Sequence, residues 1–145
     1  MKLKKIFFDA YRSLENAEID FSQNSCLGLV GINESGKTNV LSAIRILDEE
    51  LDLTKKDSPR LSGTLPSIRF LFEVGDEDKK IVDDEFKKWL SEKSLLDKEF
   101  QLENINLMYH ASINKDDEEV RDVCIENIKI GFLLKMSGLA ESVNF

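Results

Sequence analysis

The chain has 145 residues, of which 41% are hydrophobic and 33% are charged. This balance is typical of a globular domain and excludes collagen-like and low-complexity chains. The formal net charge is −8, which excludes a uniformly basic nucleic-acid-binding surface. Residues 1–45 are near neutral, with six basic and five acidic residues, so the acidity belongs to the rest of the chain.

The positions of cysteine and histidine, and the lengths of the apolar runs, further restrict the class of protein. Cys26 and Cys124 lie far apart in apolar sequence, a pattern that predicts reduced, buried thiols. His110 is the only histidine, so a zinc site of the Cys/His kind is excluded. No stretch approaches the ~18 apolar residues of a membrane span, and no secretory signal is visible. The sequence therefore predicts a cytoplasmic protein without membrane contact.

The chain opens with three expected strands. Leu3–Phe8 and Ala17–Phe21 are rich in apolar and aromatic residues, and a turn at Ser13–Asn16 would join them into a hairpin. Cys26–Val30 is a short and nearly continuous apolar run. Such a run predicts a strand that is buried on both faces.

A helix and a loop are expected next. Apolar residues at helical spacing predict a helix that buries Val40, Leu41, Ile44, Leu47 and Leu51. Residues 52–66 contain both prolines and are expected to form a loop. Ile68–Val74 alternates strictly between apolar and other residues, which predicts a strand, and Gly75–Asp78 predicts a turn after it.

The last third predicts one helix and a second hairpin. Ile81–Leu90 has the spacing of an amphipathic helix. Ile105–Ile113 and Val120–Ile130 read as paired strands on either side of a polar turn at residues 114–118. Residues 131–145 have the composition of a further helix.

Residues 31–38 read GINESGKT and match the phosphate-loop pattern G-x-x-x-x-G-K-[S/T]. Its glycines permit a tight turn that points backbone N–H groups, with the following helix N-terminus, at a phosphate. Lys37 would contact the β- and γ-phosphates, and the Thr38 hydroxyl would bind Mg²⁺. The expected strand before the motif and the helix after it supply the context that it needs. A solvated, glycine-bounded surface loop is the alternative interpretation.

Other nucleotide-binding classes fit less well. Residues 114–117 read NKDD and match the guanine-reading N-K-x-D element. A D-x-x-G element is absent, however, and these residues are ordinary in a hairpin turn, which is the interpretation we favour. Small-molecule P-loop kinases usually begin almost directly with the P-loop strand, whereas a hairpin precedes it here.

This hairpin and the phosphate loop carry a family resemblance. The strand before Tyr11-Arg12-Ser13-Leu14, the strand after it, and residues 31–41, GINESGKTNVL, resemble the N-terminal lobe of RecF/SMC/OLD-type ATPases, the ABC-class or "AAA family" P-loop ATPases. The resemblance covers residues 1–51 closely and the rest only in architecture. It implies an α/β fold with a mixed sheet around the P-loop helix and an antiparallel β subdomain. Residues 1–145 would form one partial ATPase head, divided into 1–51, the loop 52–66, and 67–145.

The resemblance also implies partners and site residues. ATP and Mg²⁺ would be the cofactors, and a homodimer or a head-to-head partner ATPase lobe would close around the nucleotide, in DNA repair or phage defence. The implied cofactor-binding residues are Arg12, Ser13, Gly31, Asn33, Glu34, Ser35, Gly36, Lys37, Thr38 and Asn39, with Thr38 on the metal. The alternative for Arg12 is an exposed turn arginine in a weak surface ion pair. DNA binding by a full-length protein is not indicated by the charge of this chain, and Lys56 and Arg60 are expected to be solvated.

Hydrolysis would require residues that this sequence does not supply. An ABC-type site needs a Walker B acid and a second acid that polarises water. In residues 68–73, Arg69 interrupts the apolar run, and residues 61–64, LSGT, are not followed by the glycine and helix of a signature motif. No catalytic residue is therefore assigned. The chain is expected to be a fragment of a longer ATPase, or a short protein that binds nucleotide without turnover. A non-catalytic adaptor and, third, a small-molecule kinase are the alternatives.

Overall fold

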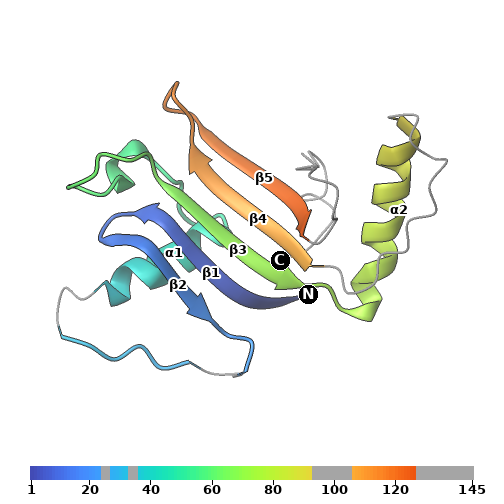
Figure 1. Cartoon of the computed structure of the whole chain (residues 1–145), viewed down its shortest axis with the longest axis horizontal. Helices are drawn as coiled ribbons and strands as arrows, with labels where there is room; N and C mark the ends of the chain where they lie inside the picture. The colour runs from blue at the N-terminus through green and yellow to red at the C-terminus, as the bar shows by residue number, and fades with distance from the viewer. Residues whose placement is uncertain (24–26, 33–35, 93–105, 127–145) are drawn as a thin grey trace.

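The computed structural model describes residues 1–23, 27–32, 36–92 and 106–126. Five strands form one sheet in the order β2-β1-β3-β4-β5, in which every pairing is antiparallel. Figure 1 shows α1 lying across one face of this sheet, whereas α2 stands beyond one end of the strands. The elements are β1 Lys2–Tyr11, β2 Leu14–Asp20, α1 Lys37–Leu47, η1 Lys55–Asp57, β3 Ser67–Glu73, α2 Asp76–Glu92, β4 Asn106–Ile113 and β5 Glu119–Glu126.

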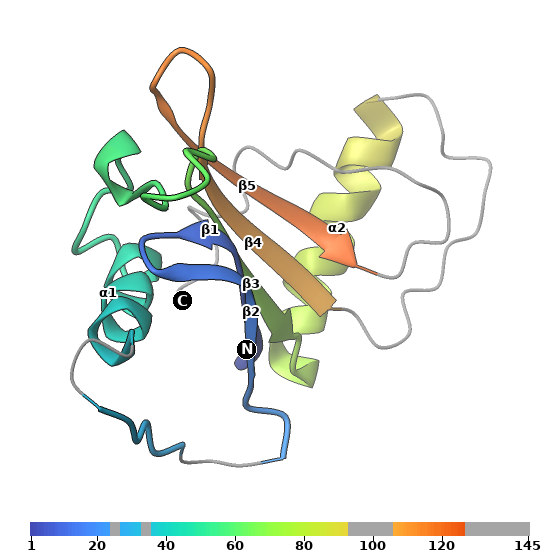
Figure 2. The same cartoon turned by 60° about the vertical axis from the view of Figure 1, so that its left-hand side comes forward.

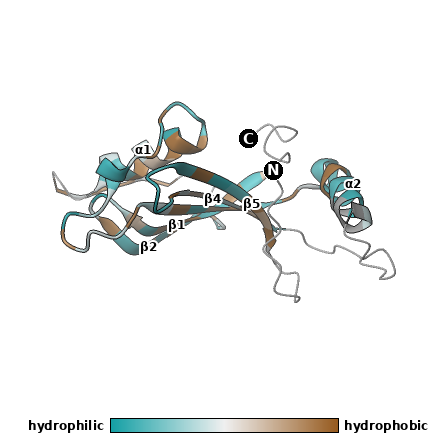
Figure 3. Ribbon diagram, turned by 90° about the horizontal axis from the view of Figure 1, so that it is seen from above, coloured by the Kyte–Doolittle hydropathy of each residue, from teal (hydrophilic) through white to brown (hydrophobic). Residues whose placement is uncertain are grey.

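The core lies between the sheet and α1. On the face that α1 covers, β3 buries Ile68, Phe70 and Phe72. The strand predicted at residues 68–74 is thus confirmed, but its burial does not alternate strictly, because Leu71 between them is buried as well. Figure 3 shows the sheet from above, with α1 on one side of it and α2 set apart. The strand residues that are at most 2% exposed on this face include Ile6, Phe8, Ile68, Phe70, Leu107 and Tyr109.

The hairpin at the start of the chain is confirmed, but its predicted turn is wrong. Tyr11 pairs with Leu14, so the turn consists of Arg12 and Ser13 alone and does not extend to Asn16. Arg12 has a φ of 54°, the left-handed conformation that two-residue hairpin turns require. An arginine is an unusual residue there, and its backbone N–H donates to the carbonyl oxygen of Asp57 at 2.7 Å.

The buried face of α1 differs from the predicted one. Val40 and Leu47 are buried as expected, but Leu41 is 57% exposed, and Ala43 and Ile46 take the remaining core positions. The predicted and the observed sets of buried residues both have helical spacing, so only packing against the strands decides which set is buried.

The predicted buried strand at 26–30 is wrong for the residues that the structure describes. Residues 27–30 are not in a strand and are exposed, and Val30 is 98% exposed. A strand needs a neighbour that satisfies its backbone N–H and C=O groups, and the five described strands pair with one another instead. Cys26 lies outside the described residues. The mixed sheet around the P-loop helix remains a prediction.

Two further element boundaries, after β3 and at the end of β5, differ from the predicted ones. The turn predicted at Gly75–Asp78 is wrong, because α2 begins at Asp76. Its first turn carries three acidic residues, which the positive end of the helix dipole stabilises. The strand predicted to reach Ile130 is described as far as Glu126, and residues 127–145, with the expected final helix, lie outside the described part.

The turn between β4 and β5 agrees with the interpretation of residues 114–117 as a hairpin turn. The Asn114 side-chain oxygen accepts hydrogen bonds from the backbone N–H groups of Asp116 and Glu118, each at 2.9 Å. Asp117 adopts a φ of 63°. The asparagine is thus used within the turn, in the manner of an Asx turn. None of the described helices combines the length and apolar character that crossing a membrane requires.

The sheet face opposite α1 carries a polar row around His110. Arg69 donates to both carboxylate oxygens of Asp9, at 2.8 and 2.6 Å. The Ser67 hydroxyl donates to Asp9 at 3.0 Å and lies 2.9 Å from Nε2 of His110. Because the single Ser67 proton goes to Asp9, Nε2 of His110 must carry a proton and donate to Ser67.

We predict that replacement of a core isoleucine costs far more stability than replacement of an exposed one. Ile68 is 0% exposed and Ile32 is 83% exposed. Ile68→Ala should lower the free energy of unfolding by about 2–5 kcal/mol through lost burial and a cavity, whereas Ile32→Ala should change it by less than about 0.5 kcal/mol. Urea unfolding followed by circular dichroism measures both values, and similar losses would contradict the packing described here.

We also predict that the His110 side chain makes stability pH-dependent. Burial lowers the pKa of His110 below its ordinary value of 6.5, although the nearby Asp9 opposes this. The unfolded state therefore binds a proton more readily, and the free energy of unfolding should fall as the pH drops below about 6.5. His110→Gln should show a flatter profile in urea unfolding between about pH 7.5 and 5.5. An equally steep profile in this variant would assign the effect to other groups.

Candidate functional site

The second glycine of the phosphate loop lies against the hairpin turn. Gly36 precedes α1 with a φ of 89°, which a side chain disfavours. A Cβ atom at this position would lie 3.0 Å from Cδ2 of Leu14 and 3.3 Å from Oγ of Ser13. Both the backbone conformation and the close packing therefore require glycine here.

Ser13 and Asn39 connect the same two segments. The Asn39 side-chain amide donates to Oγ of Ser13 at 2.8 Å, although the two residues are 26 positions apart in the chain. Asn39 belongs to the first turn of α1. The structure thus brings together three of the residues expected at the site, Ser13, Gly36 and Asn39, where α1 begins (Figure 2).

Lys37 points back along the loop that precedes it. Its ammonium group donates to the carbonyl oxygens of Gly31 and Ile32, at 2.8 and 2.6 Å. Thr38 is exposed in the same helical turn, and the first turn of α1 contains no acidic residue. The positive end of the helix dipole is therefore not neutralised by a side chain of that turn. Asn33, Glu34 and Ser35 lie outside the described residues.

Arg12 is held by a buried carboxylate. Its Nε donates to Oδ1 of Asp57 at 2.8 Å, and Nη1 lies 3.3 Å from the Ser42 hydroxyl. The guanidinium also lies over the Tyr11 ring, 5.1 Å from its centroid. The Asp57 side chain is only 9% exposed, against 38% for that of Arg12. This contact differs from the weak ion pair between two exposed side chains that was the alternative for Arg12.

The second carboxylate oxygen of Asp57 accepts hydrogen bonds from a residue of its own loop. Oδ2 accepts from both the backbone N–H and the hydroxyl of Thr54, each at 3.0 Å, so Thr54 and Asp57 cap the short helix η1 reciprocally. A buried charge needs such partners to offset the loss of hydration. Asp57 was not among the site residues predicted from the sequence, and its only signal there is its three-residue spacing from Thr54, which is typical of a capping box.

A cavity of about 790 Å³ opens beside the start of α1. It contains three cationic side chains, Arg12, Lys56 and Arg60, together with the acidic Glu15 and Asp57. Because Asp57 is occupied by Arg12 and Thr54, the cavity has a positive balance within an acidic chain. Its remaining lining residues are Ser13, Asn39, Ser58 and Leu61.

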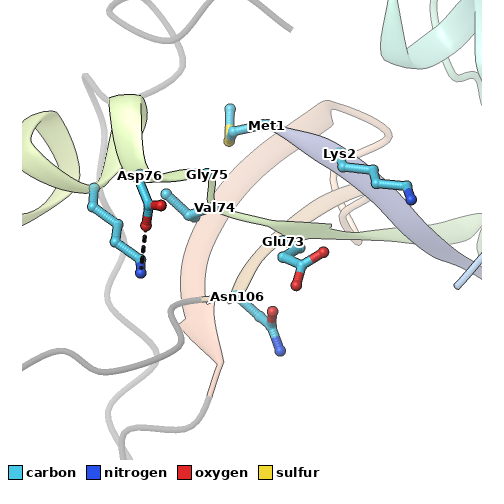
Figure 4. A pocket seen from close by; sticks show the side chains of 8 residues that line it. Met1, Lys2, Glu73, Val74, Gly75, Asp76 and Asn106 are labelled. Atoms are coloured by element: carbon cyan, nitrogen blue, oxygen red, sulfur yellow. Dashed lines mark hydrogen bonds and ion pairs between the residues drawn. The ribbon is translucent and has the colours of Figure 1, made fainter.

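A second cavity, of about 430 Å³, lies at the other end of β1. Figure 4 shows its lining side chains, among which Asp76 forms an ion pair with Lys79 at 2.9 Å. Glu73, which also lines it, pairs with Lys4 at 2.9 Å. Lys2 lies opposite Glu73 in the sheet, so the length of β1, about 30 Å, separates Glu73 from Arg12. Glu73 is therefore far from the phosphate loop, in agreement with rejecting residues 68–73 as a Walker B strand.

Among the described residues, no group of three or more His, Cys, Asp and Glu side chains is arranged to hold a metal ion. The polar groups near the start of α1 are hydroxyls, amides, backbone groups and cations, together with two carboxylates, Glu15 and the paired Asp57. Such a set suits a ligand that brings its own negative charge and its own metal ion, as a nucleotide with Mg²⁺ does.

The comparison with known families agrees with this geometry. Residues 1–136 match the family model of the AAA ATPase domain. Because the match covers most of the chain, the chain belongs to the AAA ATPase domain family. This is a family of P-loop ATPases, which bind ATP and typically Mg²⁺. No protein of curated function matches the sequence.

We predict that Gly36 tolerates no side chain. Gly36→Ala should destabilise the chain by about 1–2 kcal/mol or more, because it forces a Cβ atom into a left-handed conformation and against Leu14. Gly28→Ala is the matched control, since nothing lies within 4 Å of a Cβ atom at that position, and it should change stability by less than about 0.5 kcal/mol. Thermal unfolding of the two variants measures the difference, and equal melting temperatures would contradict the packing at Gly36.

Proposed function

We propose that the chain binds Mg-ATP as the N-terminal half of a RecF/SMC/OLD-like ATPase head. The observation that supports this most strongly is the contact between the hairpin turn and the phosphate loop. Ser13 touches both the position of Gly36 and the side chain of Asn39, which are the positions that the resemblance assigns to one nucleotide site. The match to the AAA ATPase domain supports the same assignment.

Different residues of the phosphate loop would bind different parts of the Mg-triphosphate. Lys37 now donates to two backbone carbonyls, and phosphate oxygens would offer it stronger, charge-assisted hydrogen bonds. The start of α1 attracts negative charge through its dipole and its backbone N–H groups. The exposed Thr38 hydroxyl would bind Mg²⁺, which neutralises phosphate charge when bound. Asn33, Glu34, Ser35 and Gly31 would complete the loop around the phosphates.

Turnover of the nucleotide would depend on residues outside this site. A Walker B acid and a signature motif would come from a longer chain or from a partner head. We therefore propose that ATP promotes head-to-head association, in a homodimer or with a partner ATPase lobe. By the same resemblance, DNA repair or phage defence would be the process in which such a head takes part.

A non-catalytic interaction module is the second candidate. Exposed apolar side chains just before and within the phosphate loop favour it, with Val30 98% and Ile32 83% exposed. This candidate predicts that the intact chain gives no signal in an ATP titration and yet forms a stable complex with a full-length ATPase of the family. Binding of ATP by the isolated chain would contradict it.

We predict that Lys37→Ala weakens Mg-ATP binding at least about tenfold, since a hydrogen bond to a charged group contributes about 1.5–3 kcal/mol. Isothermal titration calorimetry measures the dissociation constant. Lys87→Ala is the control, because Lys87 pairs with Asp83 on α2, outside the proposed site. Unchanged affinity in Lys37→Ala would remove this lysine from the site, and no binding by the unmodified chain would contradict the proposed function.

A further inference from the structure

Asp57 is the only charged residue that is buried in the described part of the chain. Its Oδ1 accepts from Nε of Arg12 at 2.8 Å, and its Oδ2 accepts from the backbone N–H and the hydroxyl of Thr54, each at 3.0 Å. An ionised carboxylate accepts hydrogen bonds and donates none, so Asp57 has no hydrogen bond to give to a triphosphate. An effect of Asp57 on the nucleotide site must therefore pass through its partners.

The hairpin turn that Asp57 contacts does not favour its own conformation. Arg12 has a φ of 54°, a region that glycine, asparagine and aspartate adopt more readily than arginine. The backbone N–H of Arg12 donates to the backbone oxygen of Asp57 at 2.7 Å, so the backbone and the side chain of Arg12 are both attached to one residue. Asp57 thus supplies, from outside the turn, the contacts that stabilise this conformation.

The same turn touches α1 at two places. Oγ of Ser13 would lie 3.3 Å from a Cβ atom at Gly36, and it accepts from the Asn39 side-chain amide at 2.8 Å. Nη1 of Arg12 lies 3.3 Å from the Ser42 hydroxyl, about one helical turn further along α1. Displacement of the turn would therefore remove the packing and the hydrogen bond at the start of α1, where the backbone N–H groups of the proposed phosphate site lie.

We propose that Asp57 is a positioning residue of the nucleotide site. By holding Arg12, it keeps Ser13 against Gly36 and Asn39, and it so raises the affinity for a nucleoside triphosphate without contacting the ligand. Donors that are already in place before the ligand arrives bind it more tightly, because less freedom is lost on binding. This inference rests on the proposed function, because it takes Gly36 and the start of α1 as parts of a nucleotide site.

The test is a calorimetric titration with Mg-ATP of the unmodified chain, Asp57→Asn, Arg12→Gln and the variant with both changes. Asp57→Asn keeps the shape of the side chain and removes its charge, and it should weaken Mg-ATP binding about threefold or more. In the Arg12→Gln background the same change should alter the affinity less than about twofold, because the contact through which Asp57 acts is already lost.

Thr54→Val is the matched control. It removes the hydroxyl that bonds to Oδ2 of Asp57 and leaves the Arg12 contact at Oδ1 in place. Loosening of η1 alone should lower the melting temperature and change the Mg-ATP affinity less than about twofold. The NMR signal of the Asn39 side-chain amide gives a second measurement, made without nucleotide. It should shift in Asp57→Asn and keep its position in Thr54→Val. All titrations are made at a temperature at which circular dichroism shows each variant to be folded.

The outcomes separate this inference from the proposed function. Unchanged Mg-ATP affinity in Asp57→Asn, with binding still weakened in Lys37→Ala, would overturn the inference and leave the proposed function intact. An equal loss in Thr54→Val, or an equal effect of Asp57→Asn with and without Arg12→Gln, would also overturn it. If Asp57→Asn does not fold, Arg12→Gln tests the same contact, and unchanged affinity in that variant would overturn the inference. Absence of Mg-ATP binding by the unmodified chain would overturn both.

Discussion

The ion pair between Arg12 and Asp57 is the contact on which the arrangement of the site depends. It joins a hairpin turn to a loop that lies 45 residues further along the chain. Arg12 adopts a left-handed conformation that costs about 1–2 kcal/mol for a residue with a side chain. Asp57 offsets this cost by accepting two hydrogen bonds from Arg12, one at its carboxylate and one at its backbone oxygen. Ser13 of the same hairpin turn contacts Gly36 and Asn39. The position of the start of α1 therefore depends on the Arg12–Asp57 contact, which lies outside the phosphate loop.

The sequence predicted most of the described fold because alternation and helical spacing are local patterns. β1, β3 and β4 were found from residues such as Phe8, Phe70 and Tyr109, whose neighbours along the chain point the other way. The errors arose where pairing between distant segments decides the outcome. Val30 belongs to an apolar run that would suit a buried strand, but no described strand pairs with it. Leu41 fits one helical stripe as well as Ala43 fits another, and only contact with the sheet selects between them.

The candidate site was predictable in part for the same reason. The phosphate loop is a contiguous motif, and its expected neighbours Ser13 and Asn39 do meet at the start of α1. The contact of Asp57 with Arg12 was not predicted, because a loop has no periodicity that relates its side chains to a surface. This contact exists only once the chain has folded. The contiguous phosphate-binding motif was therefore predictable from the sequence, whereas the contact that holds the neighbouring turn was not.

The edge position of β2 limits how two such domains can associate. An edge strand exposes backbone groups that a second copy could use to extend the sheet, and β2 lies at one end of the strand order. Its exposed side chains include the carboxylates of Glu15, Glu18 and Asp20. Joining two β2 strands would bring these like charges together, so extension of the sheet through β2 of two copies is disfavoured. This constraint acts at the β2 edge alone, because β5 forms the other end of the described strand order.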